Sequence, residues 1–175
     1  SEKIYKAAIE IKERLAKENP KAYEPDLAMT YNNFACLYDE IQRFDESEKM
    51  HKAAIEILER LVKENPRAYE PDLAESYNNI AGLYKIIQRY DESENIYKVE
   101  IEIWERLAKE NPKAYEQNLA SSYNNLANLY NAIQRFDESE KMYKAAIEIR
   151  ERLVKENPKA KEPDWAMAYN NLALL

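Results

Sequence analysis

Paired asparagines recur along this chain, and their carboxamides are the groups whose type and spacing most suggest recognition chemistry. Each pair stands in a Tyr-Asn-Asn triplet, at residues 31–33, 77–79, 123–125 and 169–171. A carboxamide offers a donor and an acceptor, so it can bond an amide and a carbonyl of an extended peptide without reading its side chains. Placing asparagine instead of alanine in helices at all these positions would cost on the order of 4–5 kcal/mol, which indicates a compensating role.

No group of residues in the sequence suggests catalysis. The chain has one His, one Cys and one Gly, at His51, Cys36 and Gly82. His51 occupies the position that holds Tyr97 and Tyr143 in other copies of the pattern, which favours packing over metal binding or acid–base chemistry. Without glycine-rich loops, neither a phosphate cradle nor a dinucleotide site is expected. The sequence therefore predicts a protein that is not an enzyme and has no cofactor or metal.

Charge and composition narrow the class of partner. The net charge of −7 and the pI near 5.0 argue against a nucleic-acid backbone, which requires a basic surface. No apolar run reaches the length that crosses a membrane. Since Cys36 is single, no intramolecular disulfide can form, which fits a reducing compartment such as the cytoplasm. A protein or peptide partner is what remains.

The whole chain is built from one repeated unit. Asn-Pro falls at residues 19, 65, 111 and 157, and Ile-Gln-Arg followed by Asp-Glu-Ser-Glu recurs at the same 46-residue interval. A constant period indicates a repeat architecture. We expect a single array over residues 1–175, with units at 25–70, 71–116 and 117–162, a partial unit at 1–24 and a truncated first helix at 163–175.

Each unit is expected to contain two helices. The first begins at Pro25, Pro71, Gln117 or Pro163, because proline is tolerated in the first turn, and runs to the Ile-Gln-Arg triplet. The second begins at an acidic stretch such as residues 137–139, which suits a helix N-terminus, and ends at an Asn-Pro such as 157–158. Seven helices and a truncated eighth follow.

A family resemblance rests on large and small residues at fixed steps. The pattern Tyr123, Leu126, Ala127 and Tyr130, followed by Ser139 and Tyr143, resembles the tetratricopeptide repeat, and the long unit resembles the subtype of kinesin light chains and bacterial repeat proteins. The resemblance implies an all-α fold, an α-solenoid of antiparallel helix pairs that form a right-handed superhelix. It also implies a concave groove, lined by the first helices, that holds peptides. Gln42, Gln88 and Gln134 stand where the family's turn carries glycine.

Comparison of the copies locates a candidate site on the first helices. Positions such as Met29/Glu75/Ser121/Met167 differ from copy to copy, while the asparagines on the same helix face stay constant. In the family this face is the concave one. The candidate peptide-binding residues are the constant row Asn32, Asn78, Asn124 and Asn170, the adjacent Asn33, Asn79 and Asn125, and Glu75, Lys85, Asn128 and Asn131.

Two interpretations of the asparagines stay open. They hold the backbone of a ligand, or they bond a neighbouring helix and were copied with the unit. Lys85 is the only basic residue on the candidate face, and Asp39 and Glu40 make one end of it acidic, so a neutral to mildly basic segment is expected. The sequence thus predicts a protein–protein interaction scaffold. The alternative is a spacer that stacks head-to-tail on copies of itself.

Two residues of one helix depart from the repeat. Trp104 replaces Lys12, Leu58 and Arg150 at a position that is expected to be exposed. Glu100 replaces alanine at a packing position, where we expect a local adjustment against the neighbouring helix.

Overall fold

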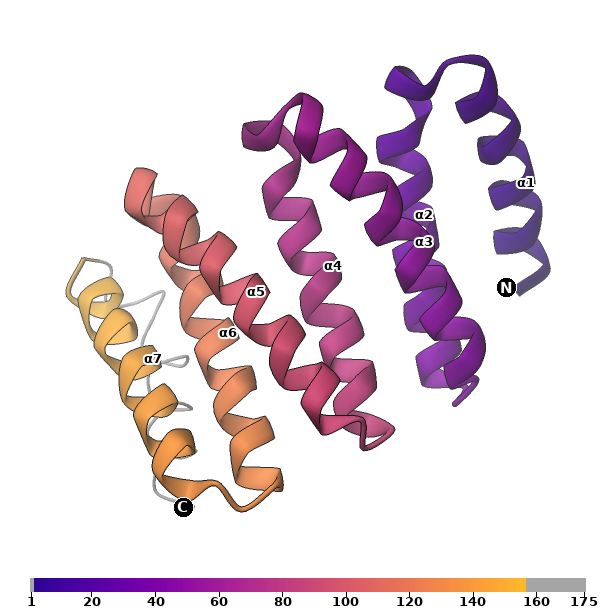
Figure 1. Ribbon diagram of the computed structural model, residues 1–175. Coiled ribbons are helices and arrows are strands. Elements are labelled where there is room, and N and C mark those ends of the chain that lie inside the picture. Colours follow the sequence, from indigo (N-terminus) through magenta and orange to yellow (C-terminus); the bar gives the residue numbers. More distant parts are fainter. Residues whose placement is uncertain (1, 157–175) are drawn as a thin grey trace. The chain divides into compact units, whose positions relative to one another are not determined.

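The structure is a computed structural model that describes residues 2–156. These residues form helices throughout, as the sequence predicts, and Figure 1 labels them in chain order. The helices are α1 (Glu2–Glu18), α2 (Pro20–Glu40), α3 (Phe44–Glu64), α4 (Pro66–Ile86), α5 (Tyr90–Glu110), α6 (Pro112–Ala132) and α7 (Phe136–Glu156). The helix expected from Pro163 lies outside the described residues. The chain divides into a first unit, Ser1–Ile87, and a second unit, Gln88–Leu175.

The first helix of each pair begins earlier than expected. Pro25 and Pro71 lie inside α2 and α4, which begin at Pro20 and Pro66 instead. The start signal is the Asn-Pro dipeptide, because proline suits the first helical position and asparagine suits the cap before it. Asn65 shows this cap, since its side-chain oxygen accepts a hydrogen bond from the Ala68 amide at 3.3 Å. The expectation that these helices begin at Pro-Asp was wrong.

The second helices end close to where the sequence predicts. The helix α7 begins at Phe136, one residue before the acidic stretch, and ends at Glu156, just before Asn157. The helices α3 and α5 have Asp and Glu in their first turn and Lys in their last turn, as the helix dipole favours.

The turn inside each pair uses a left-handed glutamine. Gln42 and Gln134 have φ of 57° and 61°, a region that usually selects glycine. Around Gln134 the amide of Arg135 bonds the Tyr130 carbonyl at 2.9 Å, and the Gln134 amide bonds the Asn131 carbonyl at 3.0 Å. This pair of bonds is the Schellman pattern that ends a helix and reverses the chain. The departure from glycine therefore leaves the turn intact.

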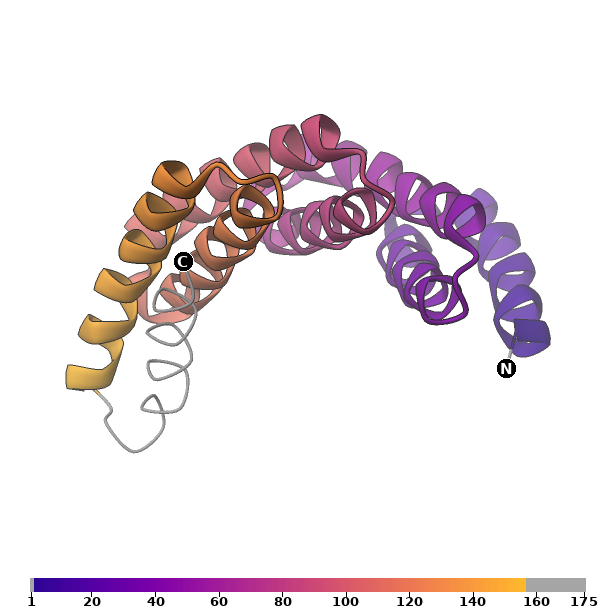
Figure 2. The ribbon, with the colours of Figure 1, turned by 90° about the horizontal axis from the view of Figure 1, so that it is seen from below.

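In the first unit, helices pack in sequence. The helix α2 contacts α1, α3 and α4, and α4 also contacts α3. Figure 2 shows α2 and α4 in one layer and α3 in the other. Ala28, Ala35, Ala74 and Ala81 are fully buried, and their small side chains let neighbouring helices approach closely. Phe34 is also buried and stacks on Tyr5 of α1, with ring centroids 5.2 Å apart.

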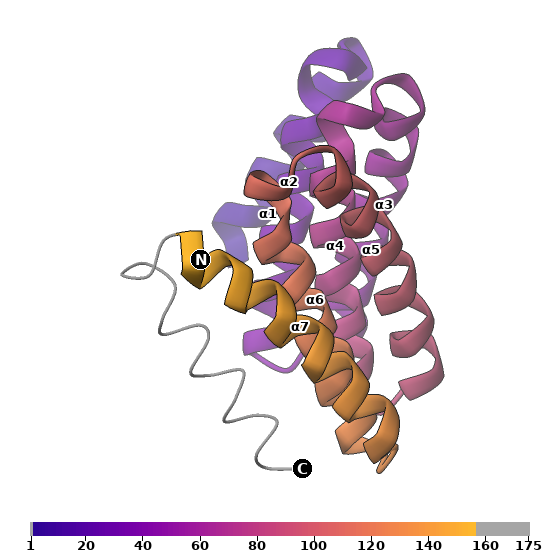
Figure 3. The same cartoon turned by 90° about the vertical axis from the view of Figure 1, so that its left-hand side faces the viewer.

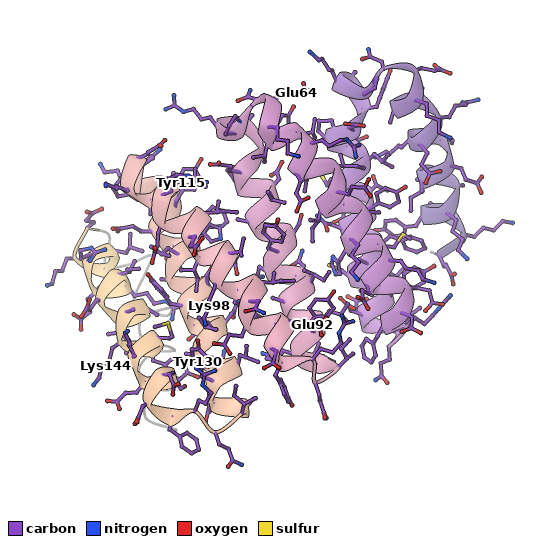
Figure 4. The ribbon with its side chains drawn as sticks, viewed as in Figure 1. Glu64, Glu92, Lys98, Tyr115, Tyr130 and Lys144 are labelled. Carbon is purple, nitrogen blue, oxygen red and sulfur yellow. The ribbon has the colours of Figure 1, made fainter. Side chains whose placement is uncertain are left out.

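In the second unit, α6 packs against both α5 and α7, and Figure 3 shows α6 and α7 side by side. Ser139 of α7 is fully buried, and its hydroxyl donates to the Ala127 carbonyl of α6 at 2.9 Å. Glu94 of α5 accepts from the Tyr130 hydroxyl at 3.0 Å and pairs with Lys98 at 2.7 Å; Tyr130 and Lys98 are labelled in Figure 4. The Ser139 bond thus links α7 to α6, and the Tyr130 bond links α6 to α5. No helix among residues 2–156 is long and apolar enough to cross a membrane.

Candidate functional site

A groove of about 400 Å³ lies between α2 and α4 of the first unit, and we call it the α2–α4 groove. Residues of α2 and α4 form its walls, and one residue of α3 lies beneath. The lining residues are Ala22, Pro25, Asp26, Met29, Asn32, Asn33, Leu58, Asp72, Glu75 and Asn79. Four of the candidate residues from the sequence are among them: Asn32, Asn33, Glu75 and Asn79. They come from two copies of the repeat and share one hollow.

Asn32 is engaged inside the fold. Its Nδ2 donates to Ser76 Oγ of α4 at 2.6 Å, and Ser76 in turn donates to the Asp72 carbonyl at 2.8 Å. The Asn32 Oδ1 lies 3.3 Å from Nδ1 of His51 on α3. The side chain of Asn32 therefore links α2 to both neighbouring helices. In this copy the asparagine bonds its neighbours, which is the second of the two interpretations, while one N–H of the amide is left for another partner.

His51 completes this polar link. Its side chain is fully buried, and its Nε2 lies 3.4 Å from Asp39 Oδ2 on α2. The imidazole spans Asn32 and Asp39 in a position that tyrosine occupies in other copies. Residues 2–156 contain no group of side chains that could hold a metal ion. His51 thus packs and bonds within the core.

The other two asparagines of the groove differ in exposure from each other. Asn33 is exposed on α2, and Asn79 is half-buried on α4. Both lie one position beyond the constant row, on the side of the helix that borders the α2–α4 groove. They place carboxamides on opposite walls.

The electrostatics of the groove are acidic. Asp26 is paired with Lys12 of α1 at 2.7 Å. Asp72 and Glu75 form no ion pair among the described residues, and burial raises the pKa of each carboxyl. The charge of Asp72 raises the pKa of Glu75 further. Two uncompensated carboxylates therefore line the α4 wall.

Apolar side chains lie beside these charges. Leu58 of α3 is 2% exposed, and Met29 on α2 is 58% exposed. Sequence reasoning missed Asp26, Asp72 and Leu58 as groove residues. The signal for the two aspartates was present, because each lies three residues before a variable position, Met29 or Glu75, and so shares its helix face.

The remaining candidates lie elsewhere. Asn78 and Lys85 are half-buried on α4, where burial lowers the pKa of Lys85. Asn124, Asn125, Asn128 and Asn131 are half-buried on α6 in the second unit. Asn128 Oδ1 accepts a hydrogen bond from the Tyr143 hydroxyl at 2.5 Å. Asn170 lies outside the described residues.

Trp104 is buried, and the expectation of exposure was wrong. It is 2% exposed, as is Glu100 one turn earlier in α5. The Trp104 ring also packs against Tyr115, labelled in Figure 4, with centroids 5.8 Å apart. The comparison with Lys12 and Arg150 misled, because long charged side chains can cover core positions with their stems, and Arg150 is itself 7% exposed.

Comparisons with known proteins agree with this geometry. Two family models of the tetratricopeptide repeat match residues 27–68 and 72–152. Neither model describes a catalytic domain. A search of curated proteins finds no match.

Solved structures share the fold. The structure resembles BtubC (BKLC) from P. vanneervenii, with a TM-score of 0.72 and 23% identity over 99% of this chain. This chain covers 63% of the BtubC chain, less than two thirds of it. It also resembles the N-terminal domain of stress-induced protein-1 (STI-1) from C. elegans, with a TM-score of 0.55 and 14% identity, over 72% of this chain and 86% of that one. With its sequential antiparallel helix pairs and these matches, the chain belongs to the tetratricopeptide repeat family.

Proposed function

We propose that this protein holds an extended segment of a partner protein in the α2–α4 groove. Tetratricopeptide repeats imply a protein–protein interaction scaffold, and the α2–α4 groove supports this position for the segment. The observation that carries the proposal is the convergence of Asn32, Asn33, Asn79 and Glu75 on one hollow of about 400 Å³. That volume falls within the range of roughly 300–1,000 Å³ that is typical of ligand sites.

In this proposal the asparagines have two roles, one in the packing of the fold and one in ligand binding. Because Asn32 already bonds Ser76 and His51, ligand contacts fall mainly on Asn33 and Asn79. Their carboxamides stand on opposite walls, so that one can donate to a peptide carbonyl while the other accepts from a peptide amide. Met29 and Ala22 offer apolar surface to the side chains of the segment.

Selection of peptides tests this proposal. A random peptide library displayed on phage is panned on the whole chain, and the enriched peptides are synthesised and titrated by calorimetry. Asn33→Ala and Asn79→Ala should each weaken binding about fivefold, the worth of roughly one hydrogen bond, and should not lower the melting temperature, because alanine is the better helix former.

Asn95→Ala is the matched control, since Asn95 is exposed on α5 of the second unit. It should leave binding unchanged and, like the two groove variants, should not lower the melting temperature. Enrichment of no peptide would overturn the proposal, as would peptides whose affinity is the same for the two groove variants and the wild type.

A second candidate, self-association, is favoured by the surface of α1. Ile4 and Ile11 are 75% and 51% exposed and lie seven residues apart, on one face of the helix. We propose that this face contacts a second copy of the chain. The complementary face expected from the sequence, at residues 163–175, lies outside the described residues.

A further inference from the structure

We infer that the α2–α4 groove selects a lysine or arginine side chain of the bound segment, and that Asp72 and Glu75 receive its charge. The inference rests on the proposed function and adds the chemistry of the ligand. It places the cationic head at the α4 wall and the aliphatic stem against the α2 wall.

The position of the two carboxylates on α4 is the first step. Asp72 and Glu75 are three residues apart, a spacing that puts both side chains on one helix face, and both line the groove. The third carboxylate of the groove, Asp26, is already neutralised by Lys12 at 2.7 Å. Among residues 2–156, Asp72 and Glu75 have no cation within ion-pair distance. The unpaired negative charge of the groove is therefore on α4.

This arrangement is unfavourable without a ligand. Burial disfavours the charged form of both carboxyls and raises the pKa of each, and the charge of Asp72 raises the pKa of Glu75 further. A cation placed between them would remove both penalties. An anionic side chain would add to them, so the groove also discriminates against acidic segments.

The apolar lining fits the rest of a basic side chain. Lysine and arginine bury their methylene stems along apolar surface and keep the charged head at a polar edge. Met29 and Ala22, both exposed on α2, supply such surface in the groove. The thioether of Met29 is 58% exposed and flexible, so it can adapt to either stem.

The other repeats offer a natural contrast. The positions of Asp72 and Glu75 hold Asp26 and Met29 in the preceding copy, and Asn118 and Ser121 in the following one. Helix α6 carries Asn118 and Ser121 and remains a regular helix. The double variant Asp72→Asn with Glu75→Ser thus places residues on α4 that this fold already accepts at the equivalent positions.

The experiment compares the two proteins with one library. The random library is panned separately on the wild type and on the double variant, and the peptides are sequenced. Wild type should enrich lysine and arginine above their frequency in the library, and the double variant should not. Each charge removed should weaken binding about fivefold. A basic peptide selected on wild type should therefore bind the double variant at least about tenfold more weakly. Replacing its lysine by acetyl-lysine should cause a similar loss.

Controls keep the outcomes distinct. Glu56→Gln removes a carboxylate whose side chain is 79% exposed and paired with Arg60, and it should leave peptide preference unchanged. If the double variant fails to fold, Glu75→Gln serves in its place, with about a fivefold loss expected. Equal enrichment of basic residues by both proteins, or none by the wild type although peptides are selected, overturns this inference and leaves the proposed function standing. Selection of no peptide at all overturns both.

Discussion

The indole Nε1 of Trp104 donates a hydrogen bond to Oε1 of Glu100, 3.1 Å away and one turn earlier in α5. The same oxygen accepts from the Ser122 hydroxyl of α6 at 2.5 Å. The other carboxyl oxygen is buried and has no partner in the described part of the chain. The two departures from the repeat are thus one feature, in which the tryptophan supplies a donor to a buried acid.

Glu100 makes the stability of the fold depend on pH. Burial raises its pKa from 4.5 to about 7, against the hydrogen bonds from Ser122 and Trp104, which lower it. A raised carboxyl pKa means that the folded state binds more protons than the unfolded state between these values. The contribution of Glu100 to the free energy of unfolding is therefore fully present below about pH 4.5 and is lost as pH rises through about 7, a loss on the order of 3 kcal/mol at most.

Denaturant unfolding at about pH 5 and about pH 8.5 measures this dependence. Glu100→Gln should remove most of the fall, because glutamine does not titrate. Glu100→Ala, which restores the residue of the other copies, should do the same. An equal loss of stability with pH in wild type and both variants would contradict the assignment.

Asn32 is expected to be a stability residue. Asn32→Ala removes the bond to Ser76 and leaves His51 with an unmet partner, so the free energy of unfolding should fall by about 1–2 kcal/mol. A double-mutant cycle with Ser76→Ala should show coupling, because the two side chains bond each other. Asn33→Ala is the control and should not lower the free energy of unfolding, because Asn33 is exposed on α2 and alanine is the better helix former. Additive effects of Asn32→Ala and Ser76→Ala would refute the direct bond.

Glycine at the turn should stabilise the protein. Gln134 has φ of 61°, where a side chain adds steric cost that glycine lacks. Gln134→Gly should raise the free energy of unfolding by roughly 0.5–1 kcal/mol. The matched control is Glu148→Gly in the middle of α7, where glycine should cost about 1 kcal/mol. Thermal melts that move the same way for both variants would show that backbone conformation is not the reason.

The α1 face predicts weak self-association. Sedimentation velocity from micromolar to millimolar protein should show larger species at the upper end. Ile11→Glu should abolish them, because a charge would be buried against apolar surface. Ile86→Glu changes a similarly exposed isoleucine on α4 and should leave association unchanged. A wild type that stays monomeric over the whole range would remove this candidate.

Periodic patterns made most of the helices predictable, whereas individual side-chain contacts could not be predicted. The 46-residue interval and the acidic stretches located the second helices to within a residue or so. Pro25 was mistaken for the helix start because proline alone was used as the signal, without the Asn-Pro dipeptide at residues 19–20. Gln117, which replaces this proline in the third copy, was the contrary signal.

The candidate site was predicted in part. The changing positions led to Glu75, and the constant pairs led to Asn33 and Asn79. The partner of Asn32 could not be inferred, because Ser76 lies 44 residues away and only packing of α2 on α4 brings them together. Burial of Trp104 also depends on such packing. Helical periodicity assigns a residue to a face of its helix, but it does not show whether a neighbouring helix covers that position.

One residue separates the helices at Asn19, Asn65 and Asn111, and its backbone is the same each time. Their φ and ψ are −146° and 83°, −146° and 82°, and −141° and 81°. A link of one residue has two free torsions, so the direction in which each of α2, α4 and α6 leaves its predecessor is stored in a single pair of angles. The link is therefore a tight turn of fixed geometry rather than a loop. One residue inserted at such a link would add two further torsions, and the shared angles of Asn19, Asn65 and Asn111 would no longer set the direction of the next helix.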